Sequence, residues 1–321
     1  MFGLRDLKNT IKITEKSVEC PVKGCDTTVQ RQRKFFRRQE EFKCLKHNIY
    51  ISPSTFEYEN TLDNLLWVDA ANRDLLFTRI GRVKRESRIS RNNSEDAVTW
   101  NIFRFLEKSK LLSGFLTNLT ACTVENLEVI YWSYSQSENR TWSFMEEARQ
   151  EFETNPEKGS EPDIIIKNSN ALLFIECKLT ANNNTVIRSR NHDVKQKYIG
   201  GGDRWYSQVF SSDFDTVAFK EKKYELLRFW LIGSWIAVCQ NLNFYLINLV
   251  PLARENTGEE AFQKHIRQTQ QRRFMRTTWE DVYHFIKNSK SESQDKLLVM
   301  RYLENKTIGY RSGGLQKAFS I

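Results

Sequence analysis

The segment that most constrains the fold is Glu161–Lys178, where two apolar runs flank a short polar stretch. Residues 163–167 and 171–177 are rich in β-branched and other apolar side chains, which favour strands. The Asn-Ser-Asn sequence at 168–170 favours a turn. The segment therefore predicts a β-hairpin.

The register of this hairpin follows from its turn. If Ser169 and Asn170 form a two-residue loop, residues whose numbers sum to 339 lie opposite each other, and a symmetric four-residue loop keeps that sum. Asp163 then faces Glu176, and strand alternation puts Lys178 on the same face. Two carboxylates and an ammonium group thus converge at one end of an apolar hairpin. Because like carboxylates repel, a hard divalent cation is their natural neutraliser.

This segment resembles the motif of the PD-(D/E)xK nuclease superfamily, which has the restriction-endonuclease-like fold. The motif stands here as Pro162-Asp163, then Glu176 thirteen residues after the aspartate, then Cys177 and Lys178. The resemblance implies that the acidic pair binds Mg²⁺ or Mn²⁺ and that Lys178 positions or activates the attacking water. It covers the chain from about residue 90 onward.

The superfamily pattern also implies an acidic residue on the helix before the hairpin and a polar residue on the helix after it. Glu95 lies on the same stripe of a predicted helix as Val98, and an acid on this buried face is expected to point toward the sheet. Capping is the alternative explanation of Glu95, because Ser94 suits the N-cap position. Gln208 is the candidate on the following helix.

Three cysteines and a histidine have the spacing of a zinc module. Cys20 and Cys25 form one short pair, and Cys44 and His47 form a second pair after eighteen intervening residues. Zinc needs four such ligands in a tetrahedron, and here the protein would supply all four, which predicts a structural metal. A chance grouping of buried cysteines is the alternative.

The loop between the two ligand pairs is strongly basic. Its basic residues are Arg31, Arg33, Lys34, Arg37 and Arg38. Basic side chains neutralise phosphates, so we expect these five to bind nucleic acid. Phe35 and Phe36 are expected in the small core of the module rather than stacked on bases. A second basic stretch, residues 82–91, follows as a connector.

The whole chain of 321 residues has a formal charge of +9, which favours a polyanionic partner. No secretory signal is visible, and the apolar run 229–239 is shorter than the ~20 residues of a membrane span. Cysteines at metal-binding spacing, rather than a disulfide framework, favour a cytoplasmic protein. We expect no membrane partner; a homodimer or a partner protein would fit a nuclease that cuts both strands.

Other periodic segments predict strands at 127–134 and 243–250 and helices at 224–238 and from 279 onward. The predicted fold class is α/β, a restriction-endonuclease-like core with a mixed central sheet flanked by helices, plus a small N-terminal zinc-binding module. The predicted parts are a zinc-finger-like nucleic-acid-binding module (residues 1–60), a basic connector (61–90) and a nuclease domain (91–321).

The expected activity is that of a metal-dependent endonuclease that hydrolyses phosphodiester bonds, with DNA favoured over RNA, in the manner of a restriction or phage-defence nuclease. Two alternatives stay open. One is a non-catalytic zinc-finger nucleic-acid-binding protein. The other is a resolvase, transposon-end nuclease or RNA nuclease on the same fold. The intact Asp163, Glu176 and Lys178 favour catalysis over binding alone.

Overall fold

The computed structural model describes residues 6–51, 54–84, 88–123, 125–187, 192–254, 258–290, 293–311 and 314–321. These residues form two compact units, each built from several segments of the chain. Unit 1 contains Met1–Arg73, Glu86–Leu111 and Trp279–Ile321, and unit 2 contains Asp74–Arg85 and Leu112–Thr278. The segment expected to be one nuclease domain, residues 91–321, is therefore divided between the two units.

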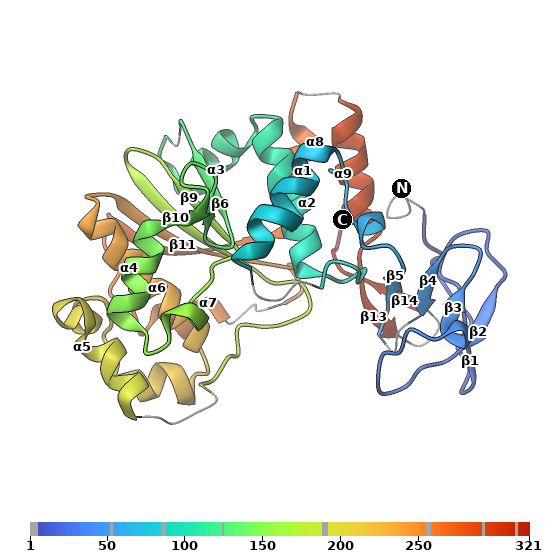
Figure 1. Ribbon diagram of the computed structural model, residues 1–321, viewed down its shortest axis with the longest axis horizontal. Helices are drawn as coiled ribbons and strands as arrows, with labels where there is room; N and C mark the ends of the chain where they lie inside the picture. Colours follow the sequence, from blue (N-terminus) through green and yellow to red (C-terminus); the bar gives the residue numbers. More distant parts are fainter. Residues whose placement is uncertain are drawn as a thin grey trace. The chain divides into compact units, whose positions relative to one another are not determined.

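A seven-stranded mixed sheet is the centre of unit 2 (Figure 1), which confirms the predicted α/β class. Its strands, in spatial order, are β12 (Arg272–Thr278), β11 (Asn243–Val250), β10 (Ala171–Cys177), β9 (Ile164–Lys167), β6 (Glu128–Tyr131), β7 (Tyr134–Ser135) and β8 (Arg140–Thr141). Strands β10, β11 and β12 are parallel, and the remaining neighbours are antiparallel.

The β9–β10 hairpin has the predicted register. Lys167 pairs with Leu172 and Ile164 pairs with Ile175, so the paired numbers sum to 339. Asn168 closes the turn, because its side-chain oxygen accepts hydrogen bonds from the next two available backbone N–H groups at 2.9 and 2.7 Å. Continuing this pairing by one residue places Asp163 opposite Glu176.

Three helices share one apolar core with the sheet: α4 (Ser143–Phe152), α5 (His192–Val209) and α6 (Tyr224–Cys239), all labelled in Figure 1. A row of apolar side chains, one from each of five neighbouring strands, contributes to this core. The row is Ile130, Ile165, Phe174, Leu246 and Phe274. The backbone leaves the helical conformation inside α5 at Gly201–Arg204, as the glycine-rich sequence there predicts.

The remaining helices of unit 2 are α3 (Leu112–Thr120) and the short α7 (Gly258–Gln263). Unit 2 also has three irregular helical turns: η4 (Asp74–Arg79), η6 (Pro156–Lys158) and η7 (Thr216–Lys220). In the described part of the chain, no helix has the length and the apolar composition required to span a bilayer.

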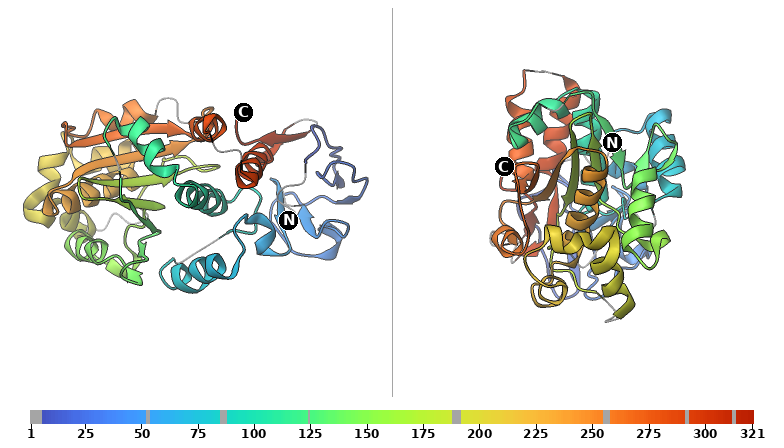
Figure 2. Two further views of the ribbon diagram at one scale, coloured as in Figure 1. Left: turned by 90° about the horizontal axis from the view of Figure 1, so that it is seen from above. Right: turned by 90° about the vertical axis from the view of Figure 1, so that its left-hand side faces the viewer.

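Unit 1 combines short strands with four helices. Its N-terminal part contains β1 (Ser17–Glu19), β2 (Thr28–Gln30), β3 (Lys43–Cys44), β4 (Ile49–Ile51), β5 (Phe56–Tyr58) and α1 (Ala70–Arg73). It also contains α2 (Glu95–Lys108), α8 (Trp279–Asn288), α9 (Gln294–Glu304), β13 (Thr307–Arg311) and β14 (Gly314–Lys317). The N-terminal strands and the C-terminal hairpin lie side by side (Figures 1 and 2), and the Tyr310 hydroxyl donates to the Thr55 carbonyl at 2.6 Å.

Two buried amides join distant segments of unit 1. The Asn92 side-chain oxygen accepts hydrogen bonds from the backbone N–H and the hydroxyl of Thr307, at 3.0 and 2.8 Å. The Asn64 side-chain oxygen accepts a hydrogen bond from Lys306 Nζ at 2.6 Å. Residues 88–92, expected to be a connector, also pair with β5, so they are part of the folded unit. Residues 85–87 of this basic stretch lie outside the described residues.

Close packing of α6 on the sheet predicts a strong effect of one substitution. A Cβ at Gly233 would overlap the Phe244 ring and lie 3.0 Å from Phe174. We expect Gly233→Ala to lower the free energy of unfolding by about 1–3 kcal/mol, measured by urea denaturation followed by tryptophan fluorescence. Gly200→Ala in α5 is the control, because a Cβ there meets nothing within 4 Å. Equal unfolding midpoints for the two variants would contradict this packing.

Candidate functional site

Asp163 precedes β9, and its carboxylate is held by two hydrogen bonds. The Trp132 indole N–H donates to Oδ1 at 3.0 Å, and the Cys177 backbone N–H donates to Oδ2 at 2.9 Å. Trp132 and Ser133 form the turn between β6 and β7 with φ values of 47° and 68°, which are unfavourable for residues with a side chain. The buried Arg149 guanidinium stabilises this turn by donating to Ser133 Oγ at 3.0 Å. The orientation of Asp163 is therefore fixed by the protein alone.

Lys178 follows β10 and lies between two carboxylates. Its ammonium group contacts Glu176 and lies 2.7 Å from Glu225 Oε2. Glu225 is in the first turn of α6, where its backbone N–H donates to Thr185 Oγ1 at 2.8 Å. The Glu176 and Lys178 side chains are only 5% and 9% exposed. We call Asp163, Glu176, Lys178 and Glu225 the carboxylate cluster.

The electrostatics of the carboxylate cluster show a surplus of negative charge. Burial raises the pKa of Glu176 well above its ordinary value; the Lys178 charge opposes this, and the Asp163 and Glu225 charges add to it. Burial favours the neutral amine of Lys178, yet the neighbouring carboxylates raise its pKa well above its usual value. Burial opposes ionisation of Glu225, but Lys178 lowers its pKa. When all are ionised, three carboxylates and one ammonium leave a formal charge of −2.

The helix after the hairpin contributes Glu225, which the sequence did not indicate. Gln208 was the expected residue, but its side chain is exposed at the C-terminal end of α5. The adjacent Val209 carbonyl accepts a hydrogen bond from Trp230 at 3.0 Å. Trp230 is five residues from Glu225, or about 7.5 Å along α6. The available signal for Glu225 is an acidic residue that opens an otherwise apolar helix.

Glu95 occupies the first turn of α2 and is half-buried. Ser94 is the N-cap of this helix, because its Oγ accepts a hydrogen bond from the Ala97 N–H at 3.1 Å. Glu95 belongs to unit 1, whereas the carboxylate cluster belongs to unit 2. Its part in binding Mg²⁺ stays a prediction.

The three cysteines and the histidine of the N-terminal module converge in unit 1. Their ligand atoms all lie within 4.8 Å of one another. Cys25 and Cys44 Sγ are 3.8 Å apart, and His47 Nδ1 lies 3.4 Å from Cys20 Sγ and 3.6 Å from Cys44 Sγ. A tetrahedral zinc with bonds of about 2.3 Å to sulfur and about 2.0 Å to nitrogen has edges of about 3.5–3.8 Å. The group could therefore hold a structural metal such as zinc.

Local turns bring these ligands together. Gly24, with a φ of 79°, allows the turn in which the Cys25 N–H donates to the Val22 carbonyl at 3.1 Å. A hydrogen bond with Cys20 lowers the pKa of the Cys44 thiol to about 4, whereas the same contact and burial raise the pKa of Cys20. One thiolate is thus favoured before any metal binds.

Metal analysis tests this group. We expect one zinc ion per chain in the purified protein, measured by inductively coupled plasma mass spectrometry. Cys25→Ser should remove most of the zinc and lower the melting temperature, because metal binding contributes to folding. Cys239→Ser is the control, since Cys239 is an exposed cysteine of unit 2. Full zinc content in Cys25→Ser would exclude Cys25 as a ligand.

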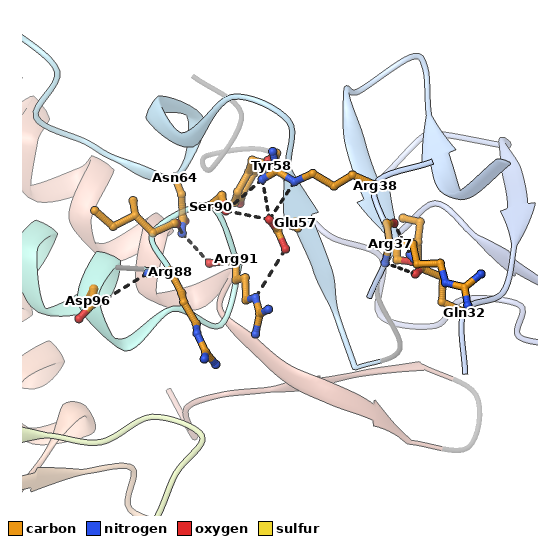
Figure 3. Close-up of polar contacts among 12 residues, drawn as sticks. Gln32, Arg37, Arg38, Glu57, Tyr58, Asn64, Arg88, Ser90, Arg91 and Asp96 are labelled. Atoms are coloured by element: carbon orange, nitrogen blue, oxygen red, sulfur yellow. Dashed lines mark hydrogen bonds and ion pairs between the residues drawn. The ribbon is translucent and has the colours of Figure 1, made fainter. Parts of the chain in front are cut away.

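The basic residues expected to bind nucleic acid differ in their contacts. Figure 3 shows the Glu57 carboxylate between Arg38, Ser90 and Arg91. Arg38 donates to Glu57 Oε1 through Nε at 3.1 Å and Nη2 at 2.5 Å, and Ser90 Oγ donates to the same atom at 2.9 Å. Arg91 Nε lies 3.5 Å from Oε2. The Glu57 side chain is 8% exposed, so these cations neutralise a nearly buried acid.

The other basic residues lie on the exterior of unit 1. Arg31 and Arg33 are exposed and donate to backbone carbonyls of residues 14 and 15, at 2.9 and 2.8 Å. The side chains of Lys34 and Arg37 are also exposed. We call Arg31, Arg33, Lys34, Arg37 and Arg38 the basic loop.

The expectation that Phe35 lies in the small core is wrong, because its side chain is 73% exposed. Gln32 is the buried side chain of this loop, and its amide bonds to Arg37 at both ends and to the Ile51 carbonyl at 2.9 Å. Phe36 is half-buried, with the Arg91 guanidinium 5.9 Å from its ring centre. The loop therefore presents one free aromatic ring among its cations.

No protein-family model, no curated protein and no solved structure matches this chain. The α/β architecture with a mixed central sheet is shown by the strand order. The restriction-endonuclease-like fold and membership of the PD-(D/E)xK superfamily stay predictions that rest on the motif and on its register.

The Glu57 contacts separate two arginine and lysine positions of equal charge. We expect Arg38→Gln to lower the free energy of unfolding by about 1 kcal/mol, because it leaves the nearly buried Glu57 less well neutralised. Lys34→Gln removes the same charge from an exposed position and should change stability by less than about 0.5 kcal/mol. Urea denaturation measures both values. Equal losses in the two variants would exclude a structural role for the Arg38–Glu57 pair.

Proposed function

We propose that this chain is a metal-dependent nuclease that hydrolyses phosphodiester bonds, with Asp163, Glu176 and Lys178 at its active site. The observation that carries the proposal is the convergence of these three side chains at one end of the β9–β10 hairpin. This pattern is that of the PD-(D/E)xK superfamily, and it agrees with a register derived from the sequence.

The donor set of the cluster suits a hard divalent cation. Carboxylate oxygens are the ligands that Mg²⁺ prefers, and the formal charge of −2 on the cluster matches one such ion. Asp163 and Glu176 would hold it, together with the backbone carbonyl of Cys177. Bound there, the ion would polarise the phosphate and lower the pKa of the attacking water.

Lys178 supplies the positive charge that the protein itself brings to the reaction. Its ammonium group would orient the attacking water or share the negative charge of the phosphate in the transition state. Glu225 acts as a positioning residue, since its contact with Lys178 fixes where that charge lies. A cation bound by Glu176 would share this carboxylate with Lys178.

The basic loop supports a nucleic-acid substrate. Its cations could neutralise successive phosphates, and the exposed Phe35 ring offers a surface on which a base can stack. DNA is the proposed polymer, and RNA is the alternative that the same metal chemistry would serve.

A second candidate function is nucleic-acid binding without catalysis. The observation that favours it is the ion pairing of Lys178 with Glu176 and Glu225, which neutralises much of the cluster without a metal. In that case the Cys₃His group and the basic loop would account for binding, and the carboxylate cluster would be structural.

Cleavage assays distinguish these functions. We expect the wild type to cut plasmid DNA, linear DNA or RNA with Mg²⁺ or Mn²⁺ and to be inactive with a chelator. Asp163→Asn, Glu176→Gln and Lys178→Ala should each lower the rate by about 100- to 1,000-fold. Circular dichroism should show that the variants stay folded.

Two variants match these changes at exposed positions of unit 2. Asp203→Asn and Lys158→Ala alter a carboxylate and a lysine outside the carboxylate cluster, and should cut at the wild-type rate. A wild type that binds DNA but cuts no polymer with any metal would reject the nuclease and support the binding protein. Variants as active as the wild type would show that cleavage does not use the cluster.

A further inference from the structure

A polar row crosses the sheet of unit 2 next to the apolar row described above. Glu176 pairs with Asn248 of β11, and Asn248 pairs with Arg276 of β12. Asp163, opposite Glu176, is the fourth member. Residues paired in this way point to the same face of a sheet. The change from apolar to polar therefore occurs in four neighbouring strands at the same level, which packing alone does not require.

Asn248 is fully buried, and half of its amide is unsatisfied. Its Oδ1 accepts a hydrogen bond from Asn183 Nδ2 at 2.8 Å. Its Nδ2 has no hydrogen-bond partner among the described residues, although the side chain is 0% exposed. A buried donor without a partner costs about 1–3 kcal/mol, so its retention beside Glu176 points to a ligand that accepts the bond.

Arg276 provides a second such donor in the same row. Its Nη2 donates to the Arg254 carbonyl at 3.1 Å, and this contact fixes one edge of the guanidinium group. Its Nε is buried and has no hydrogen-bond partner within the described part of the chain. The Arg254 side chain in turn donates to the Thr180 carbonyl, which ties the segments that follow β10 and β11 together.

We propose that Asn248 and Arg276 form an oxyanion-binding pair that holds a phosphate group of nucleic acid beside the carboxylate cluster. This inference rests on the proposed function and names the groups that receive its substrate. Amide and guanidinium N–H groups suit phosphate oxygens, and the arginine charge strengthens the contact. Neighbouring strands are about 4.8 Å apart, so a phosphate on this pair lies next to Glu176.

Such a pair solves an electrostatic problem of the cluster. Asp163, Glu176 and Glu225 repel a phosphodiester anion, and Lys178 is already shared between two of them. Donors one and two strands away from Glu176 add attraction without adding to the contacts of Lys178. Fixed donors of this kind also stabilise the charge that a phosphate gains in the transition state.

Binding of a small phosphate probe tests the pair directly. The probe is thymidine 3′,5′-bisphosphate, which has two phosphate groups but no internucleotide bond, titrated calorimetrically into the full chain with Mg²⁺ and with EDTA. We expect Arg276→Gln and Asn248→Asp each to weaken binding by about tenfold in at least one of the two buffers. Asn248→Asp keeps the acceptor used by Asn183, so a role limited to that bond predicts unchanged binding.

Matched controls lie on the same two strands. Arg273→Gln removes the same charge from the opposite face of β12, where Arg273 is exposed, and Asn243→Asp makes the same change at the start of β11. Both should bind the probe as the wild type does. Wild-type affinity in Arg276→Gln, or a wild type that does not bind the probe, would overturn the inference.

The outcomes also separate this inference from the nuclease proposal. A wild type that binds the probe through Arg276 but cleaves nothing would leave a phosphate site and reject the nuclease. A wild type that cleaves while Arg276→Gln binds the probe normally would do the reverse. If Asn248→Asp fails to fold, as judged by its thermal melt, the half-exposed Arg276 still decides the result.

Discussion

The pairing of β10 with its two neighbours is the constraint on which the rest of unit 2 depends. All seven residues of β10 are buried, and the strand pairs antiparallel with β9 and parallel with β11. A shift of one residue in either pairing would turn the polar side chains to the other face of the sheet. The carboxylate cluster and the polar row beside it are therefore consequences of one register. Extensive apolar burial on both faces is what makes this register stable.

Local patterns in the sequence predicted the hairpin, its register and several other elements. Strand β11 and helix α6 begin where periodicity indicates, and Ser94 caps α2 as expected. The positions of Glu225, Asn248 and Arg276 could not be predicted in this way. They reach the site through parallel pairing and helix packing between segments far apart in the chain, and no local pattern specifies such contacts.

The N-terminal module shows the same distinction. The four metal ligands lie in two short pairs, so spacing alone indicated them, and the observed distances suit a tetrahedron. Composition indicated the basic loop, but it did not reveal that Arg38 neutralises Glu57 or that Phe35 is exposed. Those outcomes depend on β5 and on the segment 88–92, whose pairing is set by tertiary structure.

Unit 1 is closed by residues that the ribosome makes last. Asn92 and Thr55 wait for Thr307 and Tyr310, and the intervening sequence is mostly unit 2. Domains form as their residues emerge, so unit 2 can fold while the partners of Asn92 and Thr55 are still missing. The metal ligands need only a short stretch of chain, and a bound ion would keep the nascent N-terminal module compact during that interval. Synthesis of the C-terminal hairpin is thus the event that completes unit 1.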